Sequence, residues 1–234
     1  MFVKNKASKD GTVDEWTPNG SILDGLKDRA KRRWLNYRLR KYRETRPERL
    51  EIFSQARTVH GHRVVESIPD ADVYNLHWIS GFIDPLPFFQ ATEQPVVWTL
   101  HDMNTFTGGC HYNVGCRRFE DQCGRCPQLG SNREKDLSHA VRTRKQEAYR
   151  SAVNTGQPHI VVSSEWLKRE TRASALLGDA SVHVIPLGLD ASTYRPRDTE
   201  GLRDTLGIPS DHCIVLFVAQ SAQNYRKGFD LLAE

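Results

Sequence analysis

Four of the five cysteines of this 234-residue chain lie in one short stretch, where their thiols could bind a metal ion. Cys123 and Cys126 form a Cys-x-x-Cys knuckle, which aims two thiolates at one point, as tetrahedral zinc requires. Cys110 and Cys116 would complete the ligand set, with His111 as a spare ligand. Four thiolates leave no open coordination position, so we expect a structural zinc ion and no catalytic metal. Two disulfides or unliganded thiols are the alternatives, and the absence of a recognisable signal peptide favours a reducing compartment.

Two histidines follow predicted strands. The β-forming run at residues 96–100 predicts a strand, with His101 and Asp102 directly after it. Residues 72–78 predict a second strand, which carries His77 at its end. Ligands bind at the carboxyl edge of an open parallel sheet, so the sequence predicts that His101 faces a crevice there. His77 could face the same crevice, or packing and loop hydrogen bonds could account for it.

Strand and helix patterns alternate along the first part of the chain. This alternation predicts an α/β fold with a Rossmann-like parallel sheet. The remaining predicted elements are helices at residues 82–91, 134–153 and 166–177 and strands at residues 159–163 and 182–186.

A second α/β unit is expected to begin after Pro186. A turn-rich connection precedes a predicted helix at residues 202–206 and a predicted buried strand at residues 214–219. Arg226, Lys227 and Gly228 then form a loop that enters a helix, where a lysine beside backbone donors suits a phosphate. The sequence therefore divides into residues 1–186, which include a cysteine loop at residues 102–130, and residues 187–234.

The segment from residue 21 to residue 49 is helix-like and strongly basic. It could be a solvated helix, a surface for anionic headgroups or a lipid-linked diphosphate, or a nucleic-acid surface. Because no long apolar run accompanies it, we expect a cytoplasmic protein with possible peripheral contact at the inner face of the cell membrane. Its basic residues are Lys27, Arg29, Lys31, Arg32, Arg33, Arg38, Arg40, Lys41, Arg43, Arg46 and Arg49.

Several motifs together resemble bacterial retaining glycosyltransferases of the GT-B fold, in the large family often numbered four. The cysteine-bearing stretch is the most specific, and it matches a subgroup associated with cell-envelope polysaccharide synthesis. The motifs are WTLHDM (98–103), FTGGCHY (106–112), CGRCPQL (123–129), VVSSEWLKRE (161–170), VIPLGLD (184–190) and RKGFDLL (226–232).

This resemblance implies transfer of a sugar, with retention, from a nucleotide-sugar donor to a glycan or lipid-linked acceptor. Residues 1–186 would be the acceptor-side domain, and residues 187–234 the start of the nucleotide-sugar-binding domain. His101 is the expected catalytic residue. The expected donor-binding residues are Lys227, Arg226, Gly228 and Glu165, and further substrate contacts are expected from His77, Asp102, Gly108 and Gly109.

The chain also departs from the family pattern. Leu187 stands where an asparagine is usual, and residues 219–221 offer no counterpart to the usual arginine. A glycine-rich opening unit and a downstream pair of glutamates are missing too, so we expect a fragment truncated at both ends. The alternatives are a truncated relic without catalysis and a zinc-containing nucleic-acid-binding protein. Glu120 and Asp121 within the cysteine loop disfavour the nucleic-acid alternative, so no nucleic acid is expected as a partner.

Overall fold

The computed structural model describes residues 1–48, 50, 52–153, 158–197, 201–219, 221–222 and 224–233. The chain divides into two compact units, Met1–Pro186 and Leu187–Glu234.

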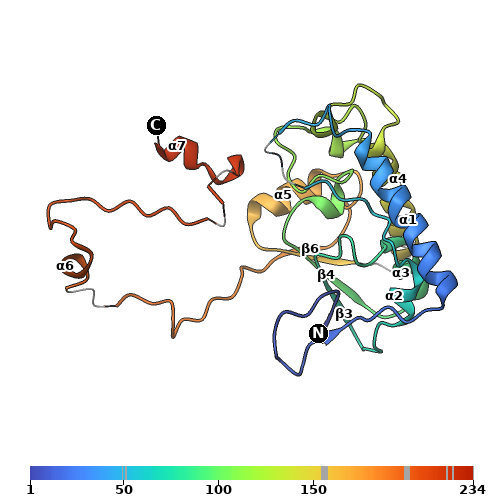
Figure 1. The fold of residues 1–234 in the computed structure, drawn as a ribbon, viewed down its shortest axis with the longest axis horizontal. Helices are drawn as coiled ribbons and strands as arrows, with labels where there is room; N and C mark the ends of the chain where they lie inside the picture. Colours follow the sequence, from blue (N-terminus) through green and yellow to red (C-terminus); the bar gives the residue numbers. More distant parts are fainter. Residues whose placement is uncertain are drawn as a thin grey trace. The chain divides into compact units, whose positions relative to one another are not determined.

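A four-stranded parallel sheet forms the centre of the first unit, and this confirms the predicted α/β fold class (Figure 1). The spatial order of the strands is their order in the sequence, as successive strand–helix–strand units produce. The strands are β3 (Tyr74–His77), β4 (Val96–Leu100), β5 (His159–Val162) and β6 (Val182–Val184), and the connecting helices are α3 (Pro85–Ala91), α4 (Leu137–Val153) and α5 (Glu165–Ala173).

Only one face of this sheet is deeply buried in the described chain. Leu76, Trp98, Ile160 and Val182 stand in register across the four strands, and all are buried. The next row along, which contains His77, is exposed or half-buried. Side chains of a strand alternate between the two faces of a sheet, and helices cover only one face here, so the second face stays open.

Aromatic rings join the helices to the buried face. Trp98 of β4 lies 5.9 Å, between ring centroids, from both Phe89 of α3 and Tyr149 of α4. Asp84 caps α3 by accepting a hydrogen bond from the backbone N–H of Leu86. The same carboxylate binds Arg144 of α4, so one buried acid ties the two helices together.

Helix α1 (Ile22–Arg40) begins at a capping box, in which Ser21 and Asp24 satisfy each other's backbone N–H groups. The helix ends nine residues before the predicted end at residue 49, since turns follow and Pro47 cannot continue a helix. Arg49 itself lies outside the described residues. Leu35 is the buried residue of α1, while Ile22 and Leu23 are largely exposed. In the described ranges, no helix has both the length and the apolar character needed to cross a membrane.

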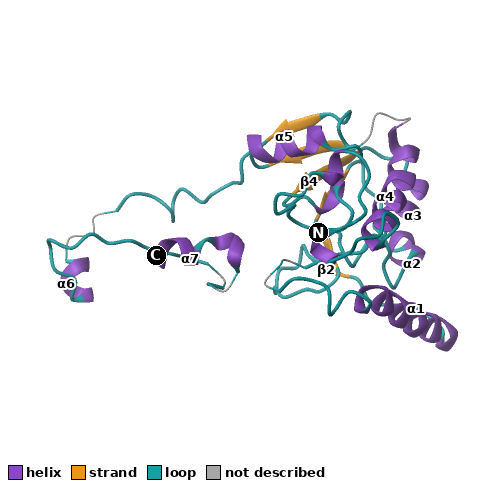
Figure 2. Cartoon of the chain, turned by 90° about the horizontal axis from the view of Figure 1, so that it is seen from above, coloured by secondary structure: helices purple, strands orange, loops and turns teal. Residues whose placement is uncertain are grey.

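Several short elements had no sequence signal, since two to five residues are too few to show a period. Figure 2 shows that the connection from β4 to α4 is mostly loop, drawn in teal. The elements are β1 (Phe2–Val3), which pairs with β2 (Asp14–Glu15), helix α2 (His62–Glu66), and the 3-10 turns η1 (Asn104–Phe106), η2 (Arg118–Glu120) and η3 (Pro127–Leu129) of the cysteine loop.

The second unit contains α6 (Leu202–Leu206), the 3-10 turn η4 (Tyr225–Lys227) and α7 (Phe229–Ala233). The strand predicted at residues 214–219 does not form, and Leu216 and Val218 are each 81% exposed. A strand is stabilised by pairing with neighbours, and no described segment pairs with this one.

Candidate functional site

His77 and His101 meet at the carboxyl edge of the sheet, where β3 and β4 end. His77 Nδ1 lies 2.9 Å from His101 Nε2, and both side chains are exposed. Two residues earlier in each segment, the Thr99 hydroxyl donates a hydrogen bond to Asn75 Oδ1 at 3.1 Å. Residues two apart on a strand share a face, so these two bonds form a polar ladder on the open face of the sheet.

The hydrogen bond between the two histidines can persist when one proton is added to the pair, but not when both rings are protonated. A hydrogen bond between two imidazoles needs one ring nitrogen as donor and the other as acceptor. Partial burial lowers the pKa of His77, and a charge on His101 lowers it further. These effects favour the neutral ring of His77, and the bond fixes the orientation of His101, whose Nδ1 has no hydrogen-bond partner among the described residues.

Asp102, predicted as a substrate contact, is held by groups inside its own loop. Its Oδ2 accepts a hydrogen bond from His111 Nδ1 at 2.6 Å, and its Oδ1 accepts from the Asn104 backbone at 2.7 Å. His111 Nε2 in turn lies 2.8 Å from Ser54 Oγ. The atom order resembles that of a hydrolase triad. His111 is only 2% exposed, which leaves no room for a substrate at its centre, so we interpret the relay as a structural tie.

Gly108 and Gly109 are buried where the cysteine loop packs most tightly. A Cβ atom on Gly108 would lie 2.7 Å from Cys123 Cβ, and one on Gly109 would lie 2.6 Å from the ring of Phe53. Gly109 also has a φ of +124°, which side-chain-bearing residues rarely adopt. Close packing accounts for both glycines, and their predicted substrate contacts stay predictions.

The four cysteines of the loop line one small cavity of about 20 Å³, together with Phe53 and Phe119. All are free thiols. Burial raises the pKa of Cys110 to about 12 and that of Cys126 to about 11, so both are protonated at neutral pH. Within the described ranges, no group of three or more His, Cys, Asp or Glu side chains is arranged to hold a metal ion, so the predicted zinc site stays a prediction.

Lys145 is a buried cation beside this loop that sequence reasoning missed. Its Nζ donates to the carbonyl oxygen of Thr107 at 3.1 Å and to that of Asn104, and burial lowers its pKa to about 8. No carboxylate among the described residues forms a salt bridge with it. The sequence does indicate that this lysine is buried, because Lys145 lies between Val141 and Tyr149 on the apolar face of α4.

Three of the four predicted donor-binding residues, Glu165, Arg226 and Lys227, are exposed, and Gly228 is half-buried. Glu165 is the first residue of α5, directly after the Ser164 cap, and so stands at the carboxyl side of β5. Arg226 and Lys227 end η4, and Gly228 follows with a φ of +70°. Arg226, Lys227 and Gly228 belong to the second unit, and their donor-binding roles stay predictions.

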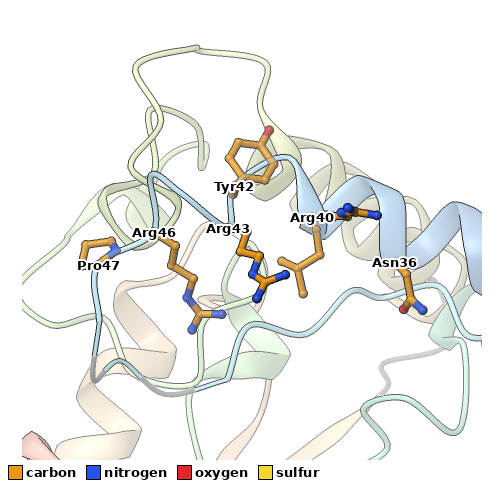
Figure 3. Close-up of a pocket in the computed structure, with 7 residues that line it drawn as sticks. Asn36, Arg40, Tyr42, Arg43, Arg46 and Pro47 are labelled. Atoms are coloured by element: carbon orange, nitrogen blue, oxygen red, sulfur yellow. The ribbon is translucent and has the colours of Figure 1, made fainter.

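A groove of about 410 Å³ lies at the end of the basic segment (Figure 3). The side chains of Arg43 and Arg46 extend to the same side of the segment (Figure 3). Leu39 and Tyr42 also line the groove and contribute apolar surface. Burial lowers the pKa of Arg46. The groove shares no lining residue with the histidine edge, and it combines positive charge with apolar surface.

One curated protein is similar to part of this chain. It is the "Putative colanic acid biosynthesis glycosyl transferase WcaC" of Escherichia coli (strain K12), which is 28% identical over 117 residues. The match covers 49% of this chain and 28% of the E. coli protein, so the chain matches well under half of that relative's length. No protein-family model matches the chain, and no solved structure does.

Proposed function

We propose that this chain is part of a retaining glycosyltransferase of the GT-B fold, acting in cell-envelope polysaccharide synthesis. It would transfer a sugar from a nucleotide-sugar donor to a glycan or lipid-linked acceptor. The observation that carries the proposal is the His77–His101 pair at the carboxyl edge of a parallel sheet, where α/β folds bind ligands. The similarity to WcaC, named as a glycosyl transferase, supports the same reaction class.

His101 is the proposed catalytic residue. A transferase accelerates the reaction by binding the transition state more tightly than the bound donor, and groups fixed in advance do this best. His77 holds the His101 ring by its Nε2, which leaves Nδ1 for a donor-sugar hydroxyl. His77 is thus a positioning residue in this proposal.

Lys227 is proposed to neutralise the diphosphate charge that grows as the glycosidic bond breaks, with Arg226 and the flexible backbone of Gly228 assisting. Both basic side chains are exposed. Glu165 would contact the donor from the start of α5.

The cysteine loop is proposed to hold a structural zinc ion. Its support is that Cys110, Cys116, Cys123 and Cys126 line one small cavity. Four thiolates with one zinc ion carry a net negative charge, and the buried ammonium of Lys145 would balance part of it. The ion would rigidify the loop that follows His101, with no part in bond breaking.

Helix α1 is proposed to contact the inner face of the cell membrane. Its first turns expose Ile22, Leu23 and Leu26, while basic residues follow along the helix. Exposed apolar side chains beside positive charge are typical of interfacial helices, which lie on anionic membranes without crossing them.

The transfer function is tested by altering the gene in its native cell and measuring surface polysaccharide. His101→Ala should reduce the polysaccharide as strongly as deletion of the gene, and Lys227→Ala should lower transfer by a factor of roughly 10² if it stabilises diphosphate charge. His183→Ala is the matched control, because His183 is an exposed histidine of β6 on the same sheet. Unchanged polysaccharide after deletion would remove the function, and a loss on deletion with normal polysaccharide in His101→Ala would remove only the catalytic assignment.

A further inference from the structure

A second basic cavity lies between α1 and α4, separate from the groove of Figure 3. It encloses about 240 Å³ and is lined by side chains from three segments that are far apart in the sequence. This is smaller than the roughly 300–1,000 Å³ of a drug-sized ligand site, so it suits a group of one or two phosphates. The lining residues are Trp34 and Arg38 of α1, Gln55, Ala56 and Arg57, and Ala140, Val141 and Arg144 of α4.

Positive charge dominates this cationic cleft. Arg38, Arg57 and Arg144 line it directly. Arg144 is already bound to Asp84 at 2.7 Å. In the part of the chain that the structure describes, neither Arg38 nor Arg57 forms a salt bridge with a carboxylate. Lys31 is close enough for Arg57 and Arg144 to lower its pKa, although burial has the larger effect.

The cations are held together in spite of their mutual repulsion. Arg57 is exposed to solvent at one side, and its partial burial lowers its pKa; the neighbouring charge of Arg144 lowers it further, while Asp84 and Glu147 oppose this. The Arg38 guanidinium lies over the Trp34 ring, with its Cζ 4.7 Å from the ring centroid, and this cation–π contact restricts its movement. Gln55 Nε2 donates to the Leu35 carbonyl at 2.8 Å, so the segment that carries Arg57 is attached to α1. Like charges fixed in a concave site cost free energy that an anion would recover.

We propose that this cationic cleft binds a phosphate or diphosphate group of a phosphorylated ligand. Two planar guanidinium groups, each with a fork of N–H donors, match phosphate oxygens in a bidentate manner. Buried Ala56 and Val141 supply a small apolar floor that leaves the space to the anion. The site does not depend on sugar transfer, since it shares no residue with the histidine edge.

Binding of inorganic pyrophosphate, measured by calorimetry on the whole chain, tests the site. Arg57→Gln and Arg38→Gln should each weaken binding by about tenfold, which corresponds to one lost charge-assisted contact of about 1.4 kcal/mol. Arg33→Gln is the matched control, because it removes the same charge from an exposed position of α1 that lines neither basic cavity. Circular dichroism confirms that each variant is folded.

The outcomes distinguish a specific anion site from nonspecific attraction to the positive charge of the protein. Selective loss in the two cleft variants supports the proposal. Equal weakening in all three variants overturns it, because general positive charge would then account for binding. Absence of pyrophosphate binding by the unaltered chain at millimolar concentration overturns it as well.

A second arm distinguishes a lipid phosphate from a soluble one. Vesicles that contain phosphatidic acid are mixed with the chain, and pyrophosphate is added as a competitor. Release by pyrophosphate, with loss of vesicle binding in Arg57→Gln, assigns the cleft to a lipid phosphate. Selective pyrophosphate binding with vesicle binding unchanged in Arg57→Gln assigns it to a soluble ligand. A failure of sugar transfer would change neither result.

Discussion

The Nδ1 atom of His77 lies 2.9 Å from the Nε2 atom of His101, which joins the last residue of β3 to the residue that follows β4. Parallel pairing aligns His77 with Thr99, so His101 extends two residues beyond on the same face. The exposed edge of the sheet therefore presents two coupled imidazoles. Their coupling has a measurable effect on titration.

The titration of His77 should report on His101. Because burial and the charge of His101 both lower the pKa of His77, NMR titration should give a value below the ordinary 6.5. His101→Ala should raise that value only in part, since burial is the larger cause. An unchanged pKa of His77 in His101→Ala would show that the rings are not coupled.

The same lowered pKa makes a prediction for stability. Between the folded-state pKa of His77 and 6.5, the unfolded chain binds more protons than the folded chain. This histidine therefore makes the free energy of unfolding fall as the pH is lowered through that window. Urea unfolding at a series of pH values, compared between the unaltered chain and His77→Gln, should show a smaller acid loss in the variant.

Asp102→Ala should destabilise the cysteine loop. It removes the acceptor of His111 Nδ1, which is buried and has no other partner there, and such a loss costs about 1–3 kcal/mol. Ser54→Ala should cost less, because Ser54 is only half-buried and the His111–Asp102 bond survives. Urea unfolding measures the free energy of unfolding of both variants. Equal losses of stability would contradict the prediction that Asp102→Ala costs more than Ser54→Ala.

Gly108→Ala should destabilise the first unit by about 1–3 kcal/mol through overpacking. The added Cβ would lie 2.5 Å from the Ser138 carbonyl oxygen and 2.7 Å from Cys123 Cβ. Gly25→Ala is the control, since nothing lies within 4 Å of its Cβ position in α1. That control should stabilise the helix by about 0.5–1 kcal/mol. Thermal unfolding of both variants measures these changes. An unchanged stability of Gly108→Ala would show that the loop can move to accommodate the added methyl group.

Purified chain should contain about one zinc ion, because clustered thiolates in a reducing cell bind metal. Cys123→Ser should lose the ion, and elemental analysis measures this. Cys213→Ser should keep it, since this fifth cysteine is exposed and lies outside the loop. Protein without metal, in which all four loop thiols react freely while the fold is intact, would remove the zinc site.

The sequence alone determined the order of the four strands of the sheet and of the helices that connect them, and it placed His77 and His101 at the ends of two of these strands. Both follow from local periodicity and from the rule that parallel strands end at one edge. It also indicated the closeness of Cys123 and Cys126, because their spacing is local. The strand predicted at residues 214–219 does not form, since β-forming residues specify a strand only where a partner strand is present.

Tertiary structure decided the rest. Ser54 reaches His111 across 57 positions of sequence, and Lys145 reaches Asn104 across 41. The cationic cleft likewise joins Arg38, Arg57 and Arg144, whose spacing follows no helical or strand period. Such contacts depend on how α1 and α4 pack around the loop between them, and packing is set by the summed burial of many side chains. No local pattern encodes that sum, so these sites become visible only when the chain is folded.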